Sequence, residues 1–267
     1  MKRDRLVNMK TWRKYGAAPY SIAVIYGGPG AAGDMGPVAR EISRYCGVLE
    51  PIQTKSTVAE QADEMYRFLK KEADLPVTLI GYSWGAWLSL IFAAGHPEMV
   101  NKLVLVSSGP FEDRYARDIM KTRLERLDAN QRREVEEILG NLGKNTAADN
   151  RLMSRLGDLI SIADSYKRLP DEQDKVECHY GIYASVWKEA IQLRSSGKLL
   201  KRAGKVSCPV LAIHGDYDPH PAEGVKLPLG RTLKDFRFIL LPKCGHQPWM
   251  EKEAREKFYD ILKAEIT

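Results

Sequence analysis

A Gly-x-Ser-x-Gly pattern occupies residues 81–85, with Ser83 at its centre. Residues 77–80 form the aliphatic and β-branched run of a buried strand, and the residues after Gly85 predict a helix, so Ser83 falls on a strand-to-helix turn. Such a turn exposes the hydroxyl above the end of the strand, and its glycines let strand and helix pass closely. Ser83 is therefore the candidate nucleophile. A purely structural turn serine is the alternative.

A serine hydroxyl is a poor nucleophile near neutral pH and needs a base. The best placed of the five histidines is His246, because it follows the last predicted strand, where a loop returns to the carboxyl edge of the sheet. The alternative is that His246 only caps the final helix. The other four are interpreted as a helix-ending residue (His96), part of a helical block (His179), a strand end (His214) and the residue after an Asp-Pro pair (His220).

A carboxylate is expected beyond the penultimate strand, where it would hold the imidazole in the right tautomer and stabilise the imidazolium that forms. Residues 214–218 offer two candidates, Asp216 and Asp218. Acidic residues beside glycine also occur as turn residues that bond to nearby backbone groups. Both carboxylates therefore stay open on this pattern alone.

Acyl transfer also needs backbone N–H donors for the oxyanion. One is expected from Trp84, directly after the serine, and the other from the Gly-Gly-Pro-Gly turn at residues 27–30, where we assign Gly28 by position. A phosphate-binding loop is the rival interpretation of this turn. However, no Lys-Ser or Lys-Thr pair follows it and the Gly-x-Gly-x-x-Gly register is absent.

Short apolar runs alternate with helix-spaced segments in the first 110 residues, which predicts parallel βαβ crossovers and an α/β, doubly wound, mostly parallel sheet. Residues 112–203 are instead charged and helix-periodic, so we expect a helical cap (lid) inserted into a core formed by residues 1–111 and 204–267. Tyr180, Tyr183 and Trp187 of this block either line a pocket or pack onto their own domain. The predicted strands are 21–26, 47–52, 77–80, 103–107, 209–213 and 236–241, and residues 249–266 predict a closing helix.

Composition excludes several classes of protein. With 44% hydrophobic residues and only four cysteines, the chain is neither disordered nor a disulfide scaffold, and the cysteines lack metal-ligand spacing, so we expect reduced thiols, no metal and no cofactor. No apolar run suits a membrane span or a signal peptide, which predicts a cytoplasmic protein. The net charge of +6 is spread thinly, which argues against nucleic acid as a partner. A small-molecule substrate is expected, and the oligomeric state stays open.

Together these motifs resemble the α/β-hydrolase superfamily, from about residue 21 to residue 261. The resemblance is carried by residues 27–30 and 81–85, the Gly-His-Pro-Glu-x-Val turn at 95–100, Gly215-Asp216-Tyr217-Asp218, and Gly245-His246. In that superfamily the acid follows a Gly-x-x-Asp spacing, which favours Asp218 over Asp216. The resemblance also implies that one or two N-terminal strands of the full eight-stranded sheet are missing.

The Gly-Gly-Pro-Gly turn and Trp84 are similar to the proline iminopeptidase branch, whose members remove N-terminal residues from peptides. In that branch a histidine normally begins the turn, and Tyr26 stands there instead. We therefore expect a serine hydrolase of the esterase or amidase type, acting on an ester, amide or related carbonyl bond through Ser83, His246 and Asp218. An aminopeptidase of the proline iminopeptidase type, and a non-catalytic ligand-binding or signalling protein on the same fold, are the alternatives.

Overall fold

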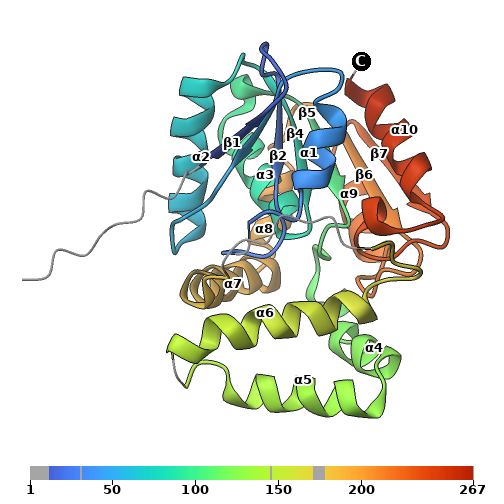
Figure 1. Cartoon of the computed structure of the whole chain (residues 1–267). Helices are drawn as coiled ribbons and strands as arrows, with labels where there is room; N and C mark the ends of the chain where they lie inside the picture. The colour runs from blue at the N-terminus through green and yellow to red at the C-terminus, as the bar shows by residue number, and fades with distance from the viewer. Residues whose placement is uncertain (1–11, 31, 145, 171–177, 267) are drawn as a thin grey trace, which may run out of the picture.

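The computed structural model describes residues 12–30, 32–144, 146–170 and 178–266, and within them the chain forms one seven-stranded sheet (Figure 1). The strand order is β1-β3-β2-β4-β5-β6-β7, and all neighbours are parallel except β1 and β3. The strands are β1 (Trp12–Tyr15), β2 (Ile22–Ile25), β3 (Val48–Pro51), β4 (Val77–Tyr82), β5 (Val100–Val106), β6 (Val210–Gly215) and β7 (Phe236–Leu241). The predicted α/β, mostly parallel sheet is thus confirmed, whereas the expected loss of N-terminal strands concerns residues 1–11, which lie outside the described residues.

Helices connect these strands and cover both faces of the sheet (Figure 1). They are α1 (Gly36–Ile42), α2 (Val58–Glu72), α3 (Trp84–Gly95), α4 (Ile119–Arg126), α5 (Ala129–Asn141), α6 (Thr146–Ala163), α7 (Tyr180–Ser195), α8 (Lys198–Ala203), α9 (Glu223–Gly230) and α10 (Arg255–Ile266), with short 3-10 turns at Pro97–Met99, Asp113–Tyr115 and Pro248–Met250. None of the helices in the described residues is both long and apolar enough to cross a lipid bilayer.

Alternation along the strands builds two buried cores, one on each face. In β2, Ala23 and Ile25 point into the core under α2, α3, α8 and α9, whereas Ile22 and Val24 point into the core under α1 and α10. The strands are buried on both faces, which is why they appear in the sequence as nearly continuous apolar runs.

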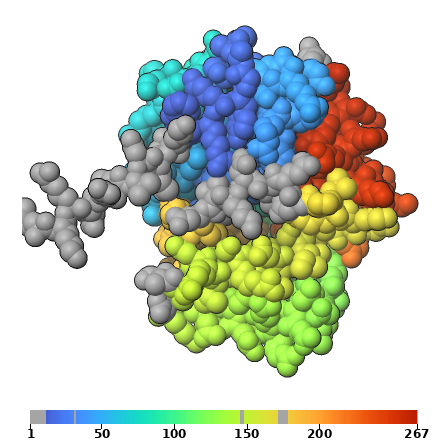
Figure 2. Space-filling view, in the orientation of Figure 1, coloured from blue at the N-terminus to red at the C-terminus, as the bar shows by residue number. Residues whose placement is uncertain are grey.

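A third, separate core lies among α4, α5 and α6. These helices form a layer beyond one end of the sheet, and Figure 2 shows the surface of residues 113–144 and 146–163 as a green and yellow block against the core. Helices α7 and α8 behave differently, because Val186, Ala190 and Leu199 belong to the core beneath α3. The cap boundaries at 112 and 203 stay a prediction.

Two elements differ from the sequence expectation. Strand β1 was not expected, because an edge strand with mixed exposure and the sequence Trp-Arg-Lys-Tyr lacks an apolar run. The closing helix begins at Arg255 rather than at Trp249, because Pro248 starts a short 3-10 turn instead.

Candidate active site

Ser83 lies at the turn between β4 and α3 in a backbone conformation that L residues rarely adopt, with φ +50° and ψ −112°. A Cβ atom on Gly81 would overlap the carbonyl oxygen of Gly85, and a Cβ on Gly85 would overlap that of Ile25. Only glycine fits at either flank, so the crowding expected from the sequence is present in the backbone. The turn leaves Ser83 partly accessible although its neighbours are buried.

Three loops bring Ser83, His246 and Asp218 together. The Nε2 atom of His246 lies 3.1 Å from the Ser83 hydroxyl oxygen, and its Nδ1 lies 2.7 Å from Oδ2 of Asp218. A carboxylate can only accept, so Nδ1 carries the proton and Nε2 is the bare acceptor that faces the hydroxyl. This is the hydrogen-bond chain that a base-activated serine requires.

Asp218 also has a second imidazole partner, His220, which the sequence analysis did not assign to the site. Its Nδ1 lies 2.8 Å from Oδ1 of Asp218, and its backbone N–H donates to the same oxygen at 2.9 Å. The rings of His220 and His246 stack with centroids 4.5 Å apart. A donor only two residues after the expected acid, in Asp218-Pro219-His220, is the signal that could have revealed it.

Burial and neighbouring charges shift the titration of this cluster. Burial alone would raise the pKa of Asp218, but the imidazoles of His246, His220 and His214 hold that pKa well below its ordinary value. Burial lowers the pKa of His220 to about 4, against the opposing pull of Asp218. At neutral pH the cluster therefore contains a carboxylate and a neutral His220.

Asp218, His220 and His246 also satisfy the distance criterion for a metal site, since one ligand atom from each lies within 4.8 Å of the others. Both imidazole nitrogens that face the carboxylate already donate hydrogen bonds to it. A metal ion bound there would have to displace these protons, so the hydrogen-bonded arrangement accounts for the cluster.

The Gly-rich turn after β2 lies against the serine turn. A Cβ on Gly27 would touch the ring of Tyr82, and Gly28 has φ +55°, which favours glycine. Asp34 accepts a hydrogen bond from the Gly27 N–H at 3.3 Å, and burial, together with the nearby Glu50, raises the pKa of Asp34 well above its ordinary value. The shift favours the neutral form of Asp34 at the base of the Gly-rich turn.

His246 is held from outside the core by a return segment, residues 164–169, which follows α6. The backbone N–H of His246 donates to the Asp164 carbonyl at 2.8 Å, and a Cβ on Gly245 would overlap that same carbonyl. Leu169 N–H donates to Met250 at 2.7 Å. The return segment thus lies against the histidine loop, residues 242–251, like an added strand.

Glu251 joins the return segment to the histidine loop. Its carboxylate is 1% exposed and accepts from the backbone N–H groups of Gly245 at 3.0 Å, Tyr166 at 2.8 Å and Lys167 at 2.7 Å. A carboxylate shared among three backbone donors is a strong acceptor, because each bond is charge-assisted. No sequence pattern pointed to this residue.

Asp164 in turn is paired with α4. Arg123 donates to both its carboxylate oxygens, at 2.8 and 2.6 Å, and both side chains are largely buried. Nearby, Arg126 donates to the Tyr217 carbonyl at 2.8 Å, next to Asp218. Helix α4 therefore contacts both the loop that carries Asp218 and the segment that supports His246.

The aromatic stripe of α7 contacts both the core and the α4–α6 layer, because Trp187 packs onto the core whereas the backbone N–H of Tyr180 donates to Asn150 of α6 at 2.9 Å. Trp187 stacks on Trp87 of α3 with centroids 6.0 Å apart and planes at 11°, and Tyr183 stacks on Trp187.

Asp216, the less favoured of the two acid candidates, accepts from the Cys244 N–H at 3.2 Å. Its hydrogen bond is therefore to the histidine loop, not to the local turn that the sequence suggested.

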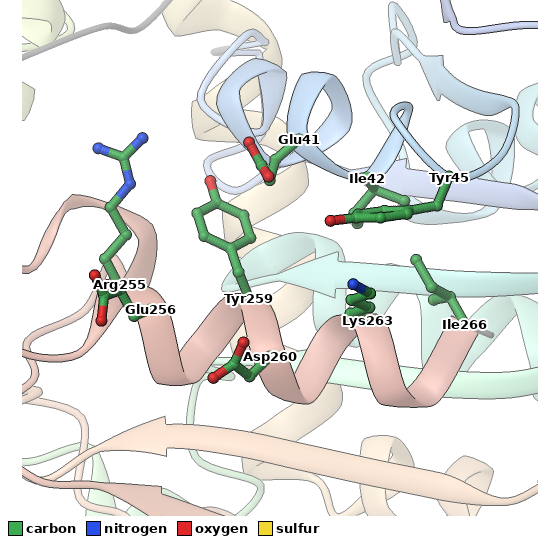
Figure 3. Close-up of a pocket in the computed structure, with 9 residues that line it drawn as sticks. All are labelled: Glu41, Ile42, Tyr45, Arg255, Glu256, Tyr259, Asp260, Lys263 and Ile266. Carbon is green, nitrogen blue, oxygen red and sulfur yellow. The ribbon is translucent and has the colours of Figure 1, made fainter.

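A cavity of about 440 Å³ lies between α1 and α10, apart from these residues (Figure 3). Its lining carries both signs of charge, from Glu41, Asp260 and Lys263, and none of Ser83, Asp218 and His246 is among the lining residues. This cavity is therefore not the place where Ser83 would meet a substrate.

Known proteins share this architecture. A profile of the alpha/beta hydrolase fold matches residues 29–253. The chain is 25% identical over 197 residues to the pimeloyl-[acyl-carrier protein] methyl ester esterase of Chromobacterium violaceum, over 72% of this chain and 71% of that protein. The structure of proline iminopeptidase from Mycobacterium smegmatis matches with a TM-score of 0.61 at 18% identity, over 95% of this chain and 92% of that one. The structure of a thermophilic esterase from Thermogutta terrifontis matches with a TM-score of 0.61 at 16% identity, over 96% of this chain and 93% of that one.

Proposed function

The chain belongs to the alpha/beta hydrolase fold family and is a hydrolase, and on that premise we propose that it is a serine hydrolase that cleaves an ester, amide or related carbonyl bond of a small molecule. The observation that carries the proposal is the continuous chain of contacts from Ser83 through His246 to Asp218, at 3.1 and 2.7 Å. The three residues come from loops at the carboxyl ends of β4, β6 and β7, where α/β folds bind their ligands.

In the first half-reaction Ser83 attacks the substrate carbonyl carbon while its proton passes to Nε2 of His246. Asp218 accepts the Nδ1–H of the resulting imidazolium and stabilises its charge. The backbone N–H groups of Gly28 and Trp84 donate to the oxyanion of the tetrahedral intermediate. His246 then returns the proton to the leaving group, whose bond to the carbonyl carbon breaks.

In the second half-reaction water replaces the leaving group. His246 takes a proton from the water, whose oxygen attacks the acyl-enzyme carbonyl, and the acid is released as Ser83 regains its proton. An alcohol that took the place of water would make the protein an acyltransferase. Comparing product formation in water with that in added methanol or glycerol separates the two reactions.

Among carbonyl substrates, an ester is favoured. The relative of Chromobacterium violaceum is named as a methyl ester esterase. A proline iminopeptidase-type reaction needs an acidic group to hold a free amine. Asp164, whose carbonyl accepts from the His246 N–H, already has its carboxylate in a bidentate pair with Arg123. The aminopeptidase remains the second candidate because its signature includes Trp84 and the Gly-rich turn.

A fluorophosphonate probe tests the proposal without knowledge of the substrate. The wild-type protein is expected to be labelled on Ser83, and Ser83→Ala is expected to lose labelling. Equal labelling of the two proteins, or no labelling of the folded wild type, would contradict the proposal. A ligand that raised the melting temperature without being consumed would instead favour a binding protein.

A further inference from the structure

His220 has no part in the reaction described above, yet it is bonded to the carboxylate at its centre. Its side chain and its backbone N–H both donate to Oδ1 of Asp218, while His246 occupies Oδ2. The residue is 9% exposed, and its carbonyl accepts from Nε2 of His214 at 2.7 Å. His220 is therefore fixed at both its backbone and its ring.

We propose that His220 is a positioning residue, whose Nδ1–H holds Oδ1 of Asp218 so that Oδ2 stays directed at the Nδ1–H of His246. The inference rests on the serine hydrolase mechanism proposed above. A carboxylate held by one donor can rotate about its Cβ–Cγ bond, whereas donors on both oxygens fix its plane. The ring stacking, with planes at 27°, holds the His246 imidazole against the same residue.

His220 acts through Asp218 and does not itself serve as the base. Nε2 of His246 is the imidazole nitrogen that contacts the Ser83 hydroxyl, at 3.1 Å. With a pKa of about 4, His220 is neutral at pH 7. A neutral ring stacked on His246 opposes the imidazolium far less than a charged one would.

The charged and titratable groups around this pair come from several elements. Asp218, His214 and His246 belong to the core loops, Tyr82 ends β4, and Arg123 on α4 adds a positive charge that lowers the pKa of His220 further. Asp164 pairs with Arg123 through two hydrogen bonds and places a negative charge beside that guanidinium. These groups are unchanged in every variant below.

The second donor also tunes the base. A hydrogen bond from His220 draws charge from the carboxylate, which weakens its stabilisation of the His246 imidazolium. Removing the donor should therefore strengthen that stabilisation and move the acidic limb of the pH–rate profile to higher pH. A residue that only filled space would leave this limb unmoved.

The test compares two replacements of His220. His220→Leu fills the space without a side-chain donor, and His220→Asn keeps an N–H near the position of Nδ1. The measurement is the second-order rate constant for labelling of Ser83 by the fluorophosphonate probe from pH 5 to pH 9. His96→Leu, which replaces a partly exposed histidine after α3, is the matched control.

We expect His220→Leu to label about tenfold more slowly at pH 8, with the acidic limb of the profile moved up by about half a pH unit. The effect is limited because the backbone N–H of residue 220 still reaches Oδ1 in every variant. His220→Asn is expected to restore most of the rate and the wild-type limb, and His96→Leu to match wild type throughout.

Two results would overturn the inference. One is a folded His220→Leu with wild-type rate and limb, and the other is equal slowing of the Leu and Asn variants with an unmoved limb. Either result leaves the proposed function standing as long as Ser83→Ala fails to label. Labelling of Ser83→Ala at the wild-type rate would instead remove the proposed function itself.

Should His220→Leu fail to fold, the wild-type protein provides an independent measurement. Histidine labelled with 15N gives ring shifts that report the tautomer and charge of each imidazole. The signals lost in His220→Asn assign the His220 ring, which we expect to be neutral and Nδ1-protonated and to stay neutral down to about pH 5. A His220 ring that is cationic at pH 6, or that carries its proton on Nε2, would overturn the inference.

Discussion

The loop that carries Ser83 and the loop that carries His246 are held in place by contacts of different range. The serine turn is fixed by its own backbone and by the neighbouring strand, through the close approach of Gly81 and Gly85. The histidine loop is fixed by the return segment, which precedes it by about eighty positions, through Asp164 and Glu251. The proposed nucleophile thus depends on local sterics, and the proposed base depends on a contact with the segment that follows the α4–α6 layer.

This difference predicts how each loop responds to mutation. A Cβ in the serine turn meets backbone atoms of the central sheet, which cannot move without disrupting the fold. A Cβ in the histidine loop meets the return segment, which can separate from the loop while the sheet stays intact. Damage to the first should remove stability and activity together, and damage to the second should remove mainly activity.

Gly85→Ala should have the largest effect. The added methyl group would collide with the carbonyl oxygens of Ile25 and Tyr26, at a cost of more than about 3 kcal/mol. We expect little folded protein and no probe labelling. Urea unfolding and circular dichroism measure the change.

Gly95→Ala in the same helix is the matched control, because nothing lies within 4 Å of its added Cβ. It is expected to be neutral or to stabilise by up to about 1 kcal/mol. Comparable stability of the two variants would show that the serine turn is not fixed by backbone crowding.

Gly245→Ala should separate activity from stability. The methyl group would overlap the Asp164 carbonyl and push the return segment from His246. A displacement near 1 Å of a reacting group can cost about 100-fold in rate, so we expect labelling to fall by about that factor while the protein stays folded. The control is Gly157→Ala in α6, whose added Cβ meets nothing within 4 Å.

Glu251→Gln is expected to have a smaller effect of the same kind. The neutral amide presents an NH₂ group to at least one of the backbone N–H donors that the carboxylate satisfied, at a cost of about 1–3 kcal/mol. Labelling should slow several-fold. Glu253→Gln, an exposed residue 3.5 Å from Lys167, should leave both stability and labelling unchanged. Equal effects of the two substitutions would contradict the assigned role of Glu251.

Lowering the pH should reduce the free energy of unfolding through protonation of His220. Near neutral pH this effect is the smallest of those predicted here. The pKa of His220 is about 4 in the folded chain and near 6.5 in the unfolded one, so the unfolded chain binds more protons between these values. The stability is full above pH 6.5 and is lost as the pH falls toward 4, by about 2 kcal/mol at pH 5. Asp218, whose pKa is lowered in the folded protein, stabilises the fold above about pH 4, and its contribution is lost only as the pH falls below that value.

Urea unfolding of wild type and His220→Asn at pH 7.5 and pH 5 isolates this contribution. The wild type should lose more stability on acidification than the variant does. Parallel losses would mean that His220 is not buried in its neutral form.

The sequence allowed the fold class to be predicted, because strands buried on both faces leave continuous apolar runs and parallel crossovers leave helical segments between them. Ser83 could also be proposed from the sequence, because the crowded backbone of its turn requires glycine at positions 81 and 85. Strand β1 escaped prediction because half-buried edge strands carry charged residues.

The support of the site was less visible. Glu251 and Asp164 contact the site through backbone groups, so the residues next to them in the sequence form no recognisable motif. Their partners come together only in the folded chain. His220 was interpreted only as the residue after an Asp-Pro pair, because its bond to Asp218 depends on ring orientation. Residues that act through other residues leave little trace in a single sequence.

The bonds between residues 164–169 and the histidine loop bear on attempts to change the substrate of this protein. Exchanging helices α4–α6 for those of a relative would remove Arg123, the partner of Asp164, and so disturb the segment that contacts His246. A working chimera must therefore keep Asp164 through Leu169 together with Glu251, and place its junctions inside the helical layer rather than at its ends.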